Sequence, residues 1–208
     1  MAGGTTPPHG ATRFVETTRG ILSYSQLAPS LAERALVVER AIASGEFASQ
    51  PISADLICSL HQQLCGDLIP EWSGRWRAGD VRVGDHTPPP AFRVAELMAD
   101  YSADLTARLS DARSVRTPHL LIEHLAFAEG RLLSIHPFQD FNGRVTRLWL
   151  RELIQRLELP AVPLVPPSPE DTFEYLTALR SADALNWHPL TQIWTKRFQT
   201  VRGDDTST

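Results

Sequence analysis

Residues His136–Arg147 read HPFQDFNGRVTR and connect two segments in which apolar residues recur with helical spacing. The first segment starts at Thr117-Pro118, a capping residue followed by proline at the first helical position. The second passes through Trp149 and ends before Pro160. The stretch is therefore predicted to be a short loop between two buried helices, and we expect the rest of the fold to form around this pair.

The same apolar spacing predicts further helices on both sides of the pair, with no alternation of strands and helices. Ser30 with Glu33 has the spacing of a capping box and predicts one helix start, and Ser53 predicts the next. A further helix is expected from about Asp171, after a proline-rich loop. We therefore predict an all-α domain of six to eight helices.

The segment Glu71–Pro90 differs in composition from the helical parts. Gly79 and Gly84 enclose a brief alternation of apolar and polar residues, and three prolines end the segment. This pattern predicts a short β-hairpin within the segment, followed by an extended strut that leads into a long amphipathic helix.

The size of the chain limits the number of domains. Its 208 residues suffice for one well-filled core, so we expect a single domain over residues 12–201. The Gly-, Pro- and Thr-rich residues 1–11 and the polar residues 202–208 are expected to be disordered.

Composition also excludes several kinds of partner. The formal net charge is −4 and the charges are mixed along the chain, so no broad basic surface for nucleic acid is expected. Cys58 and Cys65 would lie about 10 Å apart on one helix, too far for a disulfide, which fits a reduced compartment. No apolar run reaches the length of a membrane span and no signal-peptide pattern is present, so we expect a cytoplasmic protein without a membrane partner.

Gly143 lies at the start of the helix that follows the loop. Backbone N–H groups there have no helical partner and carry the positive end of the helix dipole, so such a terminus binds anions. Arg144 and Arg147 are three residues apart and can both lean over the same helix end. Two guanidiniums with a row of backbone donors suit a polyphosphate better than a single carboxylate.

Asp140 and His136 supply the remaining chemistry. Asp140 is placed to hold a hydrated Mg²⁺ that bridges phosphate oxygens, and His136 can take up a proton near neutral pH as a general base. Phe138, between them, is predicted to point into the core and fix the loop. Taken singly, these residues have ordinary explanations: a loop histidine, capping residues at Asp140 and Asn142, and solvated arginines. Their combination in one short loop favours phosphate chemistry.

The stretch resembles the signature of the Fic (Fic/Doc) family, H-x-F-x-D/E-G-N-G-R-x-x-R. The positions that agree are His136, Phe138, Asp140, Asn142, Gly143, Arg144 and Arg147. Phe141 departs, because the family usually has glycine there. The similarity covers about residues 53–198, since WRAGDVRVG resembles the family's flap and YLTALRSADALNWHPL resembles its closing helices.

The resemblance implies a Fic fold and an enzyme that transfers AMP from ATP to a Ser, Thr or Tyr hydroxyl of a target protein. His136 would deprotonate that hydroxyl, which then attacks the α-phosphate. Asp140 would hold Mg²⁺ on the α- and β-phosphates. The flap around Gly79–Gly84 would dock the target by strand addition, a main-chain contact that is nearly independent of the target's sequence.

The resemblance also implies how the nucleotide is bound. Asn142 and the Gly143 backbone would form an anion hole, Arg144 would help bind the phosphates, and Arg147 would meet the γ-phosphate. Phe138 is included among the nucleotide-binding positions. All except Phe138 agree with the placement argued from the residues alone.

Phe141 has three interpretations. Its φ is ordinary and its ring packs outward, or the ring stacks on the nucleotide and alters donor choice, or the site is weakened. We expect the first. The second corresponds to a Fic-fold transferase with another donor, for UMP, phosphocholine or phosphoryl transfer, and the third to a non-catalytic nucleotide-binding or interaction module.

Regulation in the family often involves an inhibitory helix with the pattern S/T-x-x-x-E-G/N. Thr12–Glu16 has the first five positions, but Thr17 follows instead of Gly or Asn. We therefore expect no intact internal inhibitor, and any restraint would come from a separate antitoxin-like protein or from homo-oligomerisation.

Overall fold

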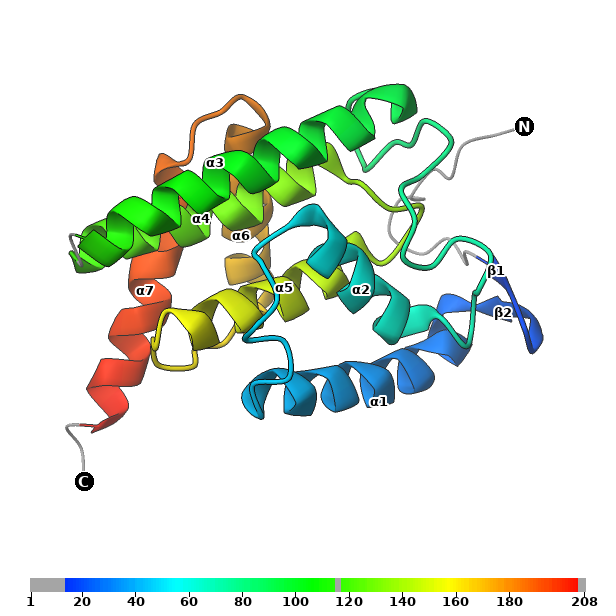
Figure 1. Cartoon of the computed structure of the whole chain (residues 1–208), viewed down its shortest axis with the longest axis horizontal. Coiled ribbons are helices and arrows are strands. Elements are labelled where there is room, and N and C mark those ends of the chain that lie inside the picture. The colour runs from blue at the N-terminus through cyan, green and yellow to red at the C-terminus, as the bar shows by residue number, and fades with distance from the viewer. Residues whose placement is uncertain (1–13, 115–116, 206–208) are drawn as a thin grey trace.

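The computed structural model describes residues 14–114 and 117–205, which form seven α-helices, one short 3-10 helix and one two-stranded antiparallel sheet (Figure 1). The elements are β1 Phe14–Thr17, β2 Gly20–Ser23, α1 Tyr24–Ala43, α2 Ala54–Cys65, η1 Ala91–Arg93, α3 Val94–Ser114, α4 Pro118–Ile135, α5 Asn142–Arg156, α6 Pro169–Asp183 and α7 His188–Asp205. The prediction of an all-α fold with six to eight helices is confirmed.

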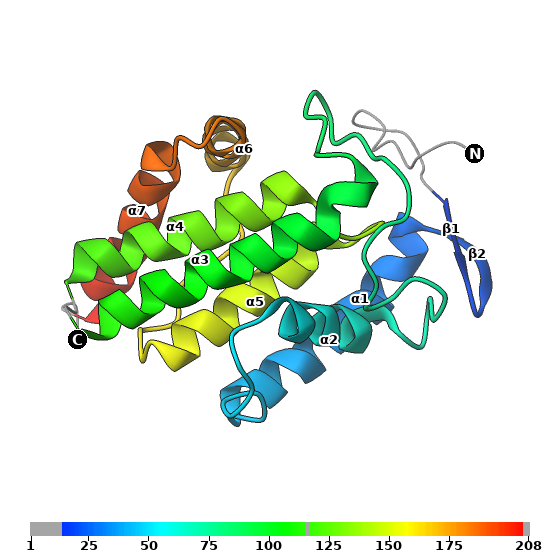
Figure 2. The ribbon, with the colours of Figure 1, turned by 45° about the horizontal axis from the view of Figure 1, so that its top comes forward.

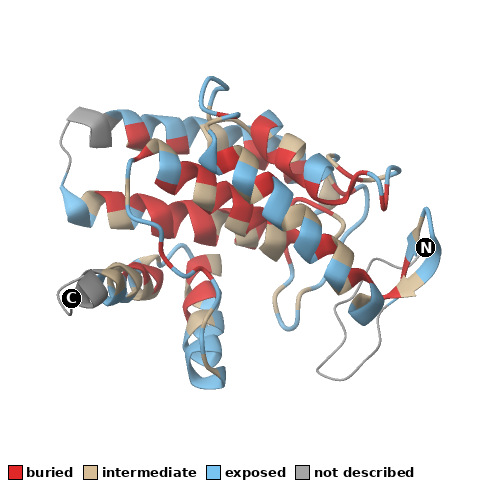
Figure 3. Ribbon diagram, turned by 90° about the horizontal axis from the view of Figure 1, so that it is seen from below, coloured by how far each residue is buried: buried red, intermediate tan, exposed pale blue. Residues whose placement is uncertain are grey.

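α5 lies at the centre of the fold, where it packs against α1, α2 and α4 (Figure 2). α4 in turn contacts α3, α6 and α7, and the buried residues concentrate on these central helices (Figure 3). Trp149 of α5 donates its indole N–H to the Tyr101 hydroxyl over 2.8 Å, and that hydroxyl donates to the Ala128 carbonyl over 3.0 Å. This buried chain of hydrogen bonds joins α5, α3 and α4.

A second buried polar network joins α4 to the C-terminal helices. Glu129 of α4 is 1% exposed and accepts hydrogen bonds from the Tyr175 hydroxyl at 2.7 Å, the Trp194 indole N–H at 2.8 Å and Arg197 at 3.1 Å. Since each donor comes from α6 or α7, one buried carboxylate fixes both helices against α4. Gly130, beside it, lets them come close, because a Cβ there would lie 2.8 Å from Leu190 Cδ1.

Helix starts follow local chemistry, with one correction. Ser53 caps α2 through the Leu56 N–H, and α4 begins with Thr117 as its N-cap and proline at its first position, as predicted. The predicted start at Ser30 is wrong. α1 begins at Tyr24, where Ser23 forms a capping box with Gln26. Ser30 lies inside that helix, which continues through Pro29 although that residue removes one i→i−4 hydrogen bond.

The short hairpin predicted within Glu71–Pro90 is reduced to a tight turn, where Val83 pairs with His86 in an antiparallel bridge and Gly84 has φ +59°. Further pairing after His86 is limited, because Pro88, Pro89 and Pro90 offer no N–H donors. The two-stranded hairpin lies instead at Phe14–Ser23.

The chain ends bear on three further predictions. Residues 1–11 and the final residues 206–208 lie outside the described part, as does Thr12. The described part of the Thr12–Glu16 segment, Phe14–Glu16, belongs to β1 and is a strand. α7 continues to Asp205, beyond residue 202 where we expected the ordered chain to end.

No helix among the described residues is long and apolar enough to cross a membrane. Cys58 and Cys65 are free thiols, as expected, and burial raises the pKa of each to about 12. Both thiols are therefore protonated and unreactive at neutral pH.

Candidate active site

His136 ends α4 in a left-handed backbone conformation, with φ 51° and ψ 60°. Its N–H still bonds to the Leu132 carbonyl at 3.0 Å, so the chain leaves the helix abruptly at this residue. Its own carbonyl accepts from Arg77 Nε at 2.8 Å. A left-handed conformation is costly for a residue other than glycine, so these two hydrogen bonds stabilise an otherwise unfavourable backbone conformation at His136.

Phe138 and Asn142 close the loop on itself. Asn142 Oδ1 accepts from the Phe138 N–H, and Asn142 Nδ2 donates to the Phe138 carbonyl, both over 2.9 Å. Phe138 is fully buried, so it points into the core as predicted, and its place among the nucleotide-binding positions stays a prediction. Because the Asn142 amide is occupied, an anion at this site would meet backbone N–H groups.

His61 of α2 contacts the same loop through its ring and its ring nitrogens. Its ring stacks on Phe138 with centroids 3.9 Å apart and an interplanar angle of 2°. Nδ1 accepts from the Gly74 N–H at 2.9 Å, which assigns the proton to Nε2, and Nε2 then donates to the Asp140 carbonyl at 3.1 Å. Burial lowers the pKa of His61 to about 4, although the bond to Asp140 opposes that shift. His61 is therefore a neutral support.

Phe141 is the N-cap of α5 and has φ 60° and ψ 16°, the left-handed conformation that glycine adopts freely. Its carbonyl accepts from the N–H groups of Arg144 and Val145, which starts the helix. The ring is 4% exposed and packs against Tyr24 and Trp72, with centroid distances of 6.2 and 5.7 Å. The expectation of an ordinary φ and an outward ring is therefore wrong. Burial of the ring offsets the strain of the left-handed backbone.

Asp140 has a protein donor on each carboxylate oxygen. Oδ1 accepts from the Phe141 N–H at 2.7 Å, and Oδ2 accepts from the Tyr24 hydroxyl at the start of α1. The carboxylate therefore ties α1 to the turn that begins α5. A contact of this kind between distant segments lies beyond what the sequence pattern alone predicted.

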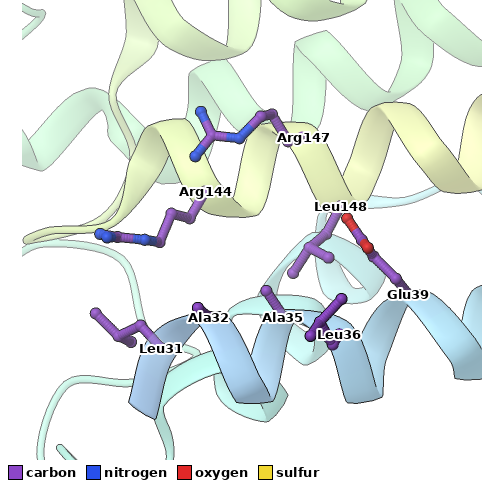
Figure 4. A pocket seen from close by; sticks show the side chains of 8 residues that line it. All are labelled: Leu31, Ala32, Ala35, Leu36, Glu39, Arg144, Arg147 and Leu148. Atoms are coloured by element: carbon purple, nitrogen blue, oxygen red, sulfur yellow. The ribbon is translucent and has the colours of Figure 1, made fainter. Parts of the chain in front are cut away.

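Arg144 and Arg147 line a pocket of about 330 Å³ between α5 and α1 (Figure 4). Leu31, Ala32, Ala35 and Leu36 of α1 form its opposite wall, and Glu39 lies at one end. A Cβ on Gly143 would be 3.8 Å from Arg147 Nη1, so this guanidinium folds back over the first turn of α5. Both arginines thus lean toward the helix N-terminus, as the three-residue spacing predicted.

Burial lowers the pKa of Arg147 from its ordinary value, opposed first by Tyr175 and reinforced by Arg144. The guanidinium remains charged, because its ordinary pKa lies far above neutrality. Two cations placed side by side and partly removed from water favour an anionic ligand. The N–H groups of Asn142 and Gly143, in the first turn of α5, add donors to the same place.

A divalent cation would depend on Asp140. Within the described residues, no three His, Cys, Asp or Glu side chains come together as a metal site. One carboxylate combined with phosphate oxygens and water is nevertheless the usual way in which Mg²⁺ is held beside a nucleotide. The donor set fits such an ion, provided that the Tyr24 hydroxyl shares or yields Oδ2.

The match to a known family covers the loop and both helices beside it. Residues 51–154 match the model of the Fic/DOC family, which is half of the chain, and the chain belongs to this family. Its relatives include proteins named protein adenylyltransferase Fic. The one from Nematostella vectensis is 31% identical over 137 residues, 65% of this chain and 30% of that protein. The one from Culex quinquefasciatus is 29% identical over 61% of this chain and 24% of its own length. The chain thus spans less than a third of these relatives.

Solved structures show the same fold. The N-terminal Fic domain of a Bartonella effector protein, from Bartonella sp. AR 15-3, superposes with a TM-score of 0.69 at 17% identity over 89% of this chain and 88% of that one. The BepC protein of Bartonella tribocorum, with bound AMPPNP, gives 0.69 at 15% identity over 91% and 94%. The arrangement of helices is therefore that of a Fic domain.

Sequence reasoning missed three residues that shape the site: Tyr24, His61 and Arg77. His61 did carry a signal, because it lies between Ile57 and Leu64 on the buried face of its helix, where a polar side chain needs a partner. The other two had no periodic pattern to reveal them.

Proposed function

We propose that the protein transfers AMP from ATP to a hydroxyl group of a target protein. The observation that carries this proposal is the pocket in which Arg144 and Arg147 lean over the N-terminus of α5, directly after the sharp turn at His136. The names of the relatives, protein adenylyltransferase Fic, support the same reaction class.

In this proposal, His136 takes the proton from the target hydroxyl as its oxygen attacks the α-phosphate. A new phosphorus–oxygen bond forms, the bond to the β-phosphate breaks, and pyrophosphate leaves. The backbone N–H groups of Asn142 and Gly143 hold the charge that develops on the phosphate oxygens. Arg144 binds the phosphates and Arg147 meets the terminal one.

Asp140 would hold the Mg²⁺ ion in this scheme, and the bound ion would neutralise part of the charge on the α- and β-phosphates. The target would dock beside the flap around Gly79–Gly84. In the same proposal, a separate antitoxin-like inhibitor or homo-oligomerisation restrains the activity, and the protein is located in the cytoplasm.

The test is incubation of the protein with ATP labelled on the α-phosphate, Mg²⁺ and a proteome extract. We expect labelled protein bands that disappear in His136→Ala. A parallel reaction with γ-labelled ATP should add no labelled bands to those of the extract alone, since pyrophosphate carries that phosphate away. Label that persists in His136→Ala would show that His136 is not the general base.

A second candidate is a transferase with a different donor. The observation in its favour is Phe141, whose ring lies between Tyr24, Trp72 and the Arg144 guanidinium, the last 5.9 Å from its centroid. Such a ring stands where the family usually has glycine. Competition among ATP, GTP, UTP and CDP-choline, read by protein mass, distinguishes this candidate from the first.

A third candidate is a module that binds nucleotide without transferring any group. Phe141→Gly restores the family pattern and so tests it. If the wild-type protein and this variant both bind ATP but leave every protein unlabelled, the non-catalytic candidate holds.

A further inference from the structure

Arg77 is a buried arginine that lies between the end of α4 and the flap segment, Gly79–Pro90. The residue is 3% exposed, and its side chain enters the interior from the chain that precedes the flap. An arginine is almost never buried to this extent without partners for its five N–H donors. The identity of these partners decides what the residue does.

The partners are main-chain carbonyls from two separate segments. On the loop side, Nε donates to His136 O at 2.8 Å and Nη2 lies 3.5 Å from Ile135 O. On the flap side, Nη1 donates to Gly79 O at 3.0 Å and Nη2 donates to Pro89 O. The Arg77 backbone N–H adds a bond to Pro137 O at 2.9 Å. One residue therefore bonds to three consecutive residues around His136 and to both ends of the flap.

The positive charge of Arg77 lies at the C-terminus of α4. The carbonyls of Ile135 and His136 lie at the C-terminus of that helix, the negative end of its dipole, which favours a cation. The nearest carboxylate is that of Asp80, 3.9 Å away and 76% exposed, so water screens it. Burial lowers the pKa of Arg77 and Asp80 opposes that change. The site is therefore built from carbonyls and a helix end rather than from an ion pair.

We infer that Arg77 is a positioning residue, whose planar fork holds the His136 carbonyl and the flap as one unit so that motion of the flap changes the placement of the His136 ring. The left-handed turn at His136 needs such an anchor, because without it the residue would relax toward a commoner backbone conformation. Lysine could keep the charge, but it could not bridge both segments with fixed geometry.

The inference rests on the proposed function only for its effect on rate. In that respect Arg77→Lys is expected to lower kcat about 10- to 100-fold, the usual effect of losing a residue that orients a reacting group, while KM for ATP changes less than about three-fold. Arg93→Lys is the matched control, because Arg93 is a nearby surface arginine paired with Glu96 at 3.2 Å. Addition of methylguanidinium to Arg77→Ala should restore part of kcat.

A readout independent of activity is amide hydrogen exchange measured on peptides from the flap, from the loop at His136–Asn142 and from α7. In Arg77→Lys, exchange should rise by roughly ten-fold in both the flap and the loop and stay unchanged in α7. Faster exchange in the flap alone, or unchanged exchange in the loop, would overturn the inference. If the wild-type protein labels no target with any donor, the proposed function fails, but this exchange result still decides the role of Arg77.

A second variant covers the case in which Arg77→Lys does not fold. Asp80 Oδ1 accepts from the Ala91 N–H at 2.7 Å, so Asp80→Ala loosens the flap from its exposed side and leaves the buried arginine in place. With Arg77 present, the loosening should reach the His136–Asn142 peptide as faster exchange. If only flap peptides respond to Asp80→Ala, Arg77 does not couple the two segments.

Discussion

The loop from His136 to Phe141 and the flap from Gly79 to Pro90 both lack regular secondary structure, yet they are held in opposite ways. Pro137, Phe138 and Phe141 of the loop are buried, whereas most of the flap is exposed, with Val81 and Pro88 as its buried residues. The loop is bonded to itself and to α1, α2 and the chain before the flap. The flap is held by the Val83–His86 bridge, by the Arg77 side chain, and by the His86 ring, which lies 3.0 Å from Ser134 O and 3.0 Å from Asp183 Oδ2.

Under the proposed function, this difference separates two tasks. Groups that act on a phosphate must keep their geometry to within a fraction of an ångström, which buried and fully bonded side chains can ensure. A surface that accepts different protein segments needs free main-chain groups and some freedom to adjust. Changes in the loop should therefore reduce stability, and changes in the flap should affect docking with little effect on stability.

The largest loss is expected for Asn142→Ala. This change leaves the N–H and the carbonyl of Phe138 buried without partners, so the free energy of unfolding should fall by about 2–4 kcal/mol. Urea unfolding followed by circular dichroism measures it. Asn186→Ala is the control, because Asn186 is exposed and should lose less than about 1 kcal/mol. Equal losses in the two variants would show that the loop is not held by its own side chains.

Acid should weaken the loop through His61. The unfolded chain binds a proton on this residue as the pH falls through 6.5, whereas the folded protein resists protonation until about pH 4. Stability is therefore unaffected above pH 6.5 and declines between pH 6.5 and 4, by up to roughly 3 kcal/mol.

The measurement compares unfolding free energies of the wild type and His61→Gln from pH 7.5 to 4.5. The variant should lose less stability on acidification, because it has no proton to take up at this position. His119→Gln serves as the control, since His119 is 76% exposed. A wild-type curve parallel to that of His61→Gln would contradict the proposed support.

Tyr24→Phe tests the contact between α1 and the loop. Removal of the hydroxyl takes away a hydrogen bond to the Asp140 carboxylate, which should cost about 2 kcal/mol. It also frees Oδ2, so the Mg²⁺ concentration that gives half-maximal labelling should fall several-fold. A rise in that concentration would mean that the hydroxyl helps to hold the ion instead of competing with it.

The smallest effect is expected in the flap. Gly84 has φ +59° and open space around its Cα, so Gly84→Ala meets no clash and costs about 1 kcal/mol of backbone strain. Labelling of a target protein should fall while ATP binding, measured by calorimetry, stays the same. Gly79→Ala is matched to it, because that site is equally open and its φ is not positive. A large loss of stability in Gly84→Ala would contradict the expectation that changes in the flap have little effect on stability.

The fold could be predicted from the sequence because its helices carry their own signals. Apolar spacing, Ser53, Thr117 and Pro118 act within a few residues of the elements that they define, and the seven helices follow from them. The start of α1 was misplaced because two capping patterns occur within ten residues, and only packing selects Ser23 over Ser30.

Part of the geometry around the candidate site residues could be predicted from the sequence, and the contacts that support them could be predicted less well. The spacing of Arg144 and Arg147 fixes their common face, since three residues on a helix determine direction. The backbone at Phe141 was mispredicted, because the ring's partners Tyr24 and Trp72 come from distant parts of the chain. Contacts of that kind depend on the assembled fold, and no local pattern encodes them.

The Glu129 network bears on how small this protein can be made. The family match ends at residue 154, within α5, whereas the three donors to Glu129 come from α6 and α7. A chain cut after Arg156 would keep the whole signature and lose Tyr175, Trp194 and Arg197 together. It would also expose the face of α4 that packs against α6 and α7, so we expect the shortest piece that folds to be longer than the piece by which the family is recognised.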